Sequence, residues 1–125
     1  MSGLTLDAGA LIALERADRR LNAWLQEAIA EDLEIAVPAG ALAQVFRDGS
    51  RQVRLVRLLL ADNVSVPPLD AGLARRAGIL CGARGAGDVV DASVVLCARA
   101  RGHTVLTSDP HGLRKLDPAL RILAV

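Results

Sequence analysis

The chain has 125 residues, a formal net charge of +1, 52% hydrophobic residues and only 2% aromatic residues. This length and composition predict one compact domain over residues 1–125 and exclude an intrinsically disordered protein. The scarcity of aromatic side chains excludes an RNA-binding surface built on stacked bases. No run of about 18 apolar residues is present, so the sequence predicts no transmembrane helix.

Short runs with strand character alternate with longer helical runs. In chain order we expect strands at 4–6, 34–37, 64–66, 104–107 and 121–125. Helices are expected at 7–20, 21–33, 38–48, 51–62, 70–83 and 88–101, with a loop at 84–87 and a short helical turn at 109–116. Alternation of strands and helices implies crossover connections. The predicted fold class is therefore α/β, with a mostly parallel sheet covered by helices on both faces.

Four aspartates lie at the ends of these predicted elements. Asp7 follows the first strand, Asp109 lies just beyond the fourth, and Asp88 and Asp91 lie at the start of the helix 88–101. Sites in open parallel sheets form outside the carboxyl ends of the strands. A helix that precedes a strand runs antiparallel to it, so the helix begins at that same edge. We therefore expect the carboxylates of Asp7, Asp91 and Asp109 to converge.

Clustered carboxylates repel one another unless a cation joins them. Oxygen ligands without His or Cys favour Mg²⁺ (or Mn²⁺), with Asp7, Asp91 and Asp109 as the predicted ligands. Such a centre suits metal-assisted hydrolysis of a phosphodiester, with Asp88 as a fourth candidate catalytic residue. Purely structural roles stay open for two residues: Asp88 as a helix N-cap, and Asp109, which precedes Pro110, as a turn or cap residue.

Three segments resemble the PIN-domain family, and within it the VapC-type toxins of bacterial type II toxin–antitoxin systems: LTLDAGALIALE, VPAGALAQVFR and DVVDASVVLCARARGHTVLTSD. The resemblance covers almost the whole chain. It implies a three-layer α/β/α PIN-like fold with four or five strands. It also implies a Mg²⁺- or Mn²⁺-dependent endoribonuclease that a cognate antitoxin holds inactive.

The resemblance places the family's first, third and fourth acids on Asp7, Asp91 and Asp109. It also reveals a departure, because the middle motif usually has Glu where this chain has Gln44. An amide oxygen can coordinate an ion but supplies no charge, so metal binding is expected to be weaker unless Asp88 supplies the missing charge. Two function classes therefore stay open: a metal-dependent endoribonuclease toxin, and a non-enzymatic PIN-like module that binds an antitoxin or RNA.

Basic and hydroxyl side chains complete the prediction. Of 15 basic residues all but Lys115 are arginine, and Arg can make forked contacts to phosphate. We expect one group of arginines to contact RNA or the antitoxin: Arg47, Arg51, Arg54 and Arg57. The alternative is that this group is only a solvent-exposed face without a partner. Hydroxyl groups that could orient a carboxylate belong to Ser93, Thr107 and Ser108.

The expected partners are an RNA substrate, a cognate antitoxin and a second copy of the chain. A two-fold symmetric dimer is the commonest assembly of a small chain. Cys81 and Cys97 are far apart in the sequence and lie in apolar segments predicted to be helical. This favours reduced, buried thiols over a disulfide or zinc site. Without a signal-peptide pattern at residue 1, the expected location is the cytoplasm.

Overall fold

The computed structural model describes residues 2–85 and 87–125. Its five strands form one parallel sheet. The strands are β1 (Gly3–Leu6), β2 (Glu34–Ala36), β3 (Val64–Ser65), β4 (Thr104–Thr107) and β5 (Ile122–Ala124). The helices are α1 (Ala8–Glu15), α2 (Arg19–Ala30), α3 (Ala39–Val45), α4 (Val53–Leu59), α5 (Ala71–Arg84), α6 (Val89–Arg101) and α7 (Pro110–Leu116).

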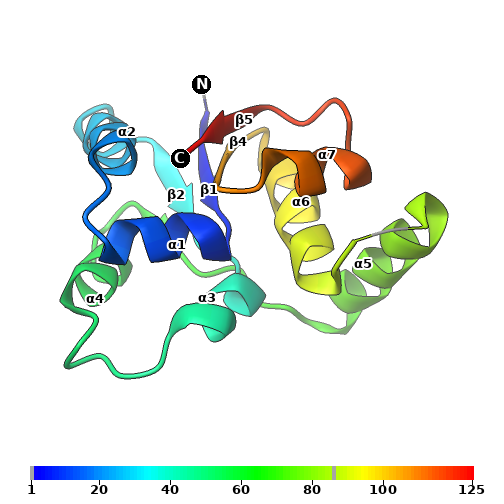
Figure 1. Ribbon diagram of the computed structural model, residues 1–125, viewed down its shortest axis with the longest axis horizontal. Coiled ribbons are helices and arrows are strands. Elements are labelled where there is room, and N and C mark those ends of the chain that lie inside the picture. Colours follow the sequence, from blue (N-terminus) through cyan, green and yellow to red (C-terminus); the bar gives the residue numbers. More distant parts are fainter. Residues whose placement is uncertain (1, 86) are drawn as a thin grey trace.

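Helices cover both faces of the sheet, which confirms the predicted three-layer α/β/α fold. Figure 1 shows α1, α2 and α4 on one side of the strands and α5, α6 and α7 on the other. Strand β1 shows how the sequence directs its side chains: Leu4 and Leu6 are buried in the core under α1 and α2. Thr5, which points to the opposite face, is buried against His103. This alternation is the two-residue period of a strand.

The strand order β3-β2-β1-β4-β5 creates a switch point next to β1. The chain first builds outward from β1 through β2 to β3, and then crosses to the other side of β1 to add β4 and β5. Helix α1, which follows β1, and helix α7, which follows β4, therefore cover opposite faces of the sheet. In open α/β sheets this is where ligands bind.

The first predicted helix, 7–20, is too long. Helix α1 ends at Glu15, and Ala17 adopts a φ of +56° that does not fit a helix. Asp18 then caps α2, because its carboxylate accepts a hydrogen bond from the backbone N–H of Leu21 at 2.8 Å. A strong local cap thus overrides the continuous helical character of the sequence.

Other predicted helices also lose their ends. Helix α2 stops at Ala30, before Asp32 with its φ of +55°. Helix α3 stops at Val45 because Phe46 is extended. The predicted helix 51–62 shrinks to Val53–Leu59, since the chain first makes a turn in which the Arg51 N–H donates to the Asp48 carbonyl at 3.0 Å.

The remaining boundaries agree to within a residue or two. Asp70 caps α5 as expected, and Gly102 ends α6 with a φ of +67° that glycine adopts without strain. Residue 86 of the predicted loop 84–87 lies outside the described residues. Within the described ranges, no helix combines the length and the apolar character that crossing a bilayer requires.

Candidate active site

Asp7 lies at the carboxyl end of the central strand and begins α1. Its carboxylate caps the helix by accepting a hydrogen bond from the Ala10 N–H at 2.9 Å. The side chain is 6% exposed, and the hydroxyl of Thr107 donates to its second oxygen. Burial raises the pKa of Asp7, the hydrogen bonds from Thr107 and Ala10 oppose this increase, and the charge of Asp109 adds to it.

Thr107 links Asp7 to the end of the neighbouring strand. While its hydroxyl donates to Asp7, the same oxygen accepts a hydrogen bond from the Asp109 N–H at 2.9 Å. Asp109 in turn caps α7 by accepting from the Gly112 N–H at 3.1 Å. One buried hydroxyl therefore holds both aspartates of the β1 and β4 ends in position, as the sequence suggested for Thr107.

Asp88 and Asp91 approach the same edge from the start of α6. Asp88 is the N-cap, accepting from the Val90 N–H at 2.6 Å. Asp91 is half-buried in the first turn of the helix. Burial is the largest cause that raises the pKa of Asp91 to about 6, followed by the negative charges of Asp88, Asp7 and Asp109. The structure thus brings the four aspartates predicted from the sequence into electrostatic contact.

The chemistry of this donor set fits a hard divalent cation, because all four side chains offer carboxylate oxygens and no ion pair with a cationic side chain is recorded for them in the described residues. Within residues 2–85 and 87–125, no three His, Cys, Asp or Glu side chains are already arranged to bind one ion together. Mg²⁺ commonly binds through only one or two carboxylates and keeps several waters. An ion here would thus need few direct protein ligands.

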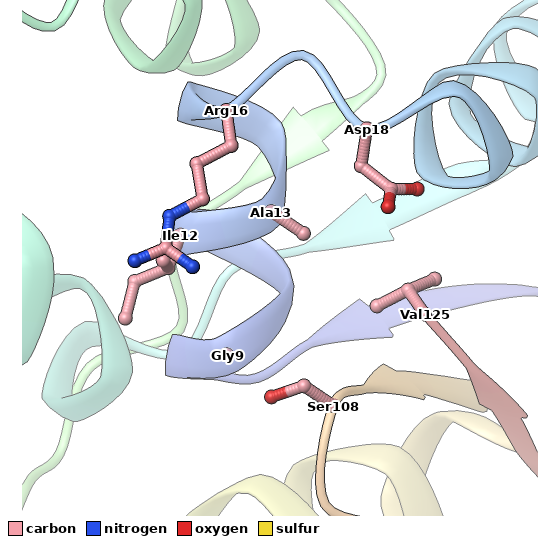
Figure 2. A pocket seen from close by; sticks show the side chains of 7 residues that line it. All are labelled: Gly9, Ile12, Ala13, Arg16, Asp18, Ser108 and Val125. Carbon is pink, nitrogen blue, oxygen red and sulfur yellow. The ribbon is translucent and has the colours of Figure 1, made fainter.

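A hollow of about 420 Å³ lies between α1 and the loop after β4 (Figure 2). Its lining residues are Gly9, Ile12, Ala13, Arg16, Asp18, Ser108 and Val125. Ser108 packs tightly under α1, since a Cβ atom on Gly9 would lie 2.0 Å from its hydroxyl oxygen. None of the four aspartates lines the hollow, but it lies on α1, which Asp7 caps, and on Ser108, which Asp109 follows.

Comparison with known proteins identifies the family. The family model described as PIN domain matches residues 4–117. The chain belongs to the PIN-domain family. A search of curated protein sequences found no match.

Solved structures share the fold of this PIN domain at low sequence identity. A chain of VapBC2 from Rickettsia felis, bound to a DNA fragment from its promoter, is 16% identical with a TM-score of 0.72, covering 98% of each chain. DNA-bound VapBC from Salmonella typhimurium is 15% identical with a TM-score of 0.72, covering 99% of this chain and 98% of that one. VapC20 from Mycobacterium tuberculosis, a sarcin–ricin loop cleaving toxin, is 16% identical with a TM-score of 0.62, covering 85% and 88%.

Gln44, predicted from the resemblance to stand where the family usually has an acid, is exposed near the end of α3. No hydrogen bond joins it to the four aspartates within residues 2–85 and 87–125, although the start of α3 packs on α6 through Gly40 and Val90. Its contribution to metal binding stays a prediction.

The four arginines expected to form one contact surface do not all lie on one helix. Arg51 precedes α4 and lies 3.8 Å from Asp48. Arg47 donates to the carbonyls of Ala43 and Phe46, so it caps the end of α3. Only Arg54 and Arg57 lie on α4, both exposed. Contacts of this surface with RNA or an antitoxin stay a prediction for those two residues above all.

Ser93, the two cysteines and the buried His103 lie in structural positions. Ser93 donates to the Val90 carbonyl at 2.5 Å inside α6. His103 is buried at the amino end of β4, the edge opposite to the acids, where its ring hydrogen-bonds Thr5. Both thiols are free, but only Cys97 is buried, and Cys81 is half-buried.

Two residues that shape the region around the site could not be predicted from the sequence. Gln52 is buried and accepts from the N–H groups of Arg47 and Asp48 at 2.8 and 3.0 Å. Its amide donates to Glu15 and to the Val45 carbonyl, which ties the loop after α3 to α1. The other is Arg16 in the hollow. A single Gln or Arg in a predicted helical segment has no neighbouring motif that would distinguish it from an ordinary surface residue.

Proposed function

We propose that this PIN domain is a metal-dependent endoribonuclease that hydrolyses RNA phosphodiester bonds with Mg²⁺ or Mn²⁺ at Asp7, Asp91 and Asp109. The observation that carries the proposal is the convergence of the aspartates at the carboxyl edge of the sheet, where one hydroxyl joins Asp7 to the Asp109 backbone. Burial, followed by the charges of the other three aspartates, raises the pKa of Asp91 there to about 6. Such an arrangement opposes folding unless a cation neutralises it. Membership of the PIN family and the RNA-cleaving activity named for VapC20 support the choice of RNA.

A bound divalent ion would supply positive charge to the scissile phosphate and lower the pKa of a water molecule. The chain's own residues do the rest. Thr107 fixes the orientation of Asp7, and the α7 cap fixes Asp109. Asp91, which has no hydrogen bond recorded to its carboxylate in the described residues, is free to accept a proton from the attacking water at its Oδ atoms. Asp88 adds negative charge at the rim.

The test is cleavage of single-stranded RNA by purified protein with Mg²⁺ or Mn²⁺, against the same reaction in excess EDTA. Asp91→Asn is the matched variant, because an amide of the same shape cannot accept the proton. We expect cleavage only with the metal and the wild-type residue. Cleavage that persists in EDTA, or in Asp91→Asn, contradicts the metal mechanism and points to a contaminating nuclease.

A second candidate is a PIN-like module that binds RNA or an antitoxin without cleaving. The neutral Gln44 and the missing preformed group of three ligands in the described residues favour it. The same assay separates the two functions. RNA binding with no cleavage at any metal concentration supports the module, whereas metal-dependent turnover excludes it.

We also propose that the protein acts as the toxin of a type II toxin–antitoxin pair in the cytoplasm. The similar VapBC structures support an antitoxin as its partner. Self-association as a homodimer is proposed from apolar side chains such as Leu60 and Ile79, which are 76% and 71% exposed. Light scattering at high concentration tests this assembly, and a monomer at every concentration contradicts it.

A further inference from the structure

The hollow between α1 and the loop after β4 has an unpaired cation on its wall. Arg16 is exposed at the end of α1 and forms no ion pair or side-chain hydrogen bond within the described residues. Figure 2 shows its guanidinium lying along Ile12, directed away from Asp18. Asp18 already accepts the α2 cap hydrogen bond from Leu21. A negatively charged ligand in the hollow would therefore meet a free guanidinium group.

The position of Arg16 matches the path of an RNA strand across the acids. Helical side chains point back toward the helix start, and Arg16 reaches back to the level of Ile12 (Figure 2). Ile12 lies five residues after Asp7, which corresponds to roughly 7.5 Å along the axis of α1. Phosphates of one duplex strand follow every ~3.4 Å of axis, and a single strand extends further. The guanidinium thus lies one or two nucleotides from the acid cluster.

The walls of the hollow suit the rest of a nucleotide. Ile12 is 41% exposed and, with Ala13, offers an apolar surface to a base or ribose. The Ser108 hydroxyl, beside Gly9, can donate or accept a hydrogen bond. A volume of about 420 Å³ falls within the range of small-molecule sites.

We propose that this hollow is a subsite for the nucleotide adjacent to the phosphodiester at the acid cluster, with Arg16 binding the phosphate of that nucleotide. The subsite rests on the proposed ribonuclease function and extends it to substrate positioning. A basic peptide would suit the acids but would be repelled by Arg16, whereas an RNA strand can meet both: one phosphate at the cation-loaded acids and the next at the guanidinium. Arg16 is thus a binding residue outside the acid cluster.

The test compares Arg16→Gln with Arg75→Gln. Arg75 is an exposed arginine on α5, across the sheet from the hollow. With a fluorescent single-stranded RNA of about 20 nucleotides, we expect Arg16→Gln to raise KM about 3- to 10-fold and to change kcat less than twofold. Arg16→Lys should recover part of the loss. The slope of log affinity against log salt should fall by about 0.7, the value of one single-strand phosphate contact, and Arg75→Gln should leave it unchanged.

A second measurement separates the subsite from the catalytic proposal. Binding of the same RNA to Asp91→Asn protein with Mg²⁺, followed by fluorescence anisotropy, needs no cleavage. If the wild type never cleaves but Arg16→Gln still weakens this binding, the subsite stands and the ribonuclease proposal fails. If cleavage is metal-dependent but Arg16→Gln behaves like Arg75→Gln in both assays, the subsite is overturned, and a peptide becomes the occupant to test.

Discussion

The two edges of the sheet treat acidic side chains in opposite ways. At the amino edge, Glu34 accepts a hydrogen bond from Arg101 at 3.1 Å and lies 3.9 Å from His103. At the carboxyl edge, Asp7, Asp91 and Asp109 have hydrogen bonds from N–H and hydroxyl groups at most. Burial, and then the charges of neighbouring aspartates, raise the pKa values of Asp7 and Asp91. One edge pairs its acid with basic side chains, and the other places its acids beside one another, where the proposed cation would neutralise them.

Asp117 shows that burial alone does not make an acid part of a site. Burial would raise its pKa, but the hydrogen bond and charge of Arg99, whose Nε lies 2.9 Å from the carboxylate, lower the pKa below its usual value. Asp91 is also partly buried, yet its charged neighbours are other aspartates. The charged neighbours, basic for Asp117 and acidic for Asp91, therefore distinguish the two partly buried acids.

The largest effect on RNA cleavage should come from neutralising Asp7 at the carboxyl edge, with Glu34 at the amino edge as the control. Asp7→Asn keeps an oxygen for the Ala10 N–H but removes a charge worth roughly 4 kcal/mol to an ion about 4 Å away at an effective dielectric of 20. We expect metal-dependent RNA cleavage to fall about 100-fold or more. Glu34→Gln, the control, should change the rate less than twofold and cost less than about 1 kcal/mol, because the pair is partly exposed. Equal losses in both variants would remove the distinction between the edges.

Thr107→Val tests the hydroxyl that joins Asp7 to the β4 end. The substitution keeps the shape but removes a buried donor and acceptor, so the free energy of unfolding should fall by about 1–3 kcal/mol. Because the Thr107 hydrogen bond lowers the pKa of Asp7, its loss should move the acid limb of the pH–rate profile to higher pH. Thr107→Ser should restore both readouts. A change in urea stability with an unmoved pH profile would make Thr107 purely structural.

Asp91→Asn should stabilise the ion-free protein at neutral pH. With a folded pKa of about 6 and an ordinary value of 3.8, the folded state holds a proton that the unfolded chain has released. The free energy of unfolding therefore falls as pH rises from about 4 to 6 and then levels. The asparagine variant should lack this fall and gain about 1 kcal/mol above pH 6, after allowance for solvent screening.

Urea titrations in EDTA from pH 4 to 8 measure this gain. Asp48→Asn is the control, because the Ser50 hydroxyl lowers the pKa of Asp48 and no gain is expected there. Saturating Mg²⁺ should cancel the advantage of Asp91→Asn by neutralising the wild-type carboxylate. A variant that is less stable than the wild type at pH 7 in EDTA would contradict the raised pKa.

The smallest effect is expected at the substituted acid position. Gln44→Glu adds one carboxylate to the α3 side of the site and should tighten Mn²⁺ binding several-fold, about 1 kcal/mol net of carboxylate repulsion. Titrations of the wild type, Gln44→Glu, Asp88→Asn and the double variant show whether Asp88 already fills this role. Equal affinities in all four would mean that neither residue lies near the ion.

The sheet and the acid positions could be predicted because they follow from patterns in the chain. Apolar runs bounded by polar residues predicted the strands. Asp7 was predicted as a site residue because it directly follows one of these runs. The ends of the first two helices could not be predicted, because no pattern in the sequence signals the positive φ values of Ala17 and Asp32. Gln52 was missed because folding alone brings its hydrogen-bond partners near, and Arg16 because the hollow that it lines exists only in the folded chain.

The hydrogen bond between Thr107 and Asp7 joins residues 100 positions apart. A ribosome that adds about 5–20 residues per second needs roughly 5–20 s to pass from one to the other. For most of that interval the aspartates of α6 have not been made, and β4 follows only at its end. The complete acid cluster thus comes into being only when synthesis is nearly finished, so the ribonuclease activity proposed above would begin only at that point.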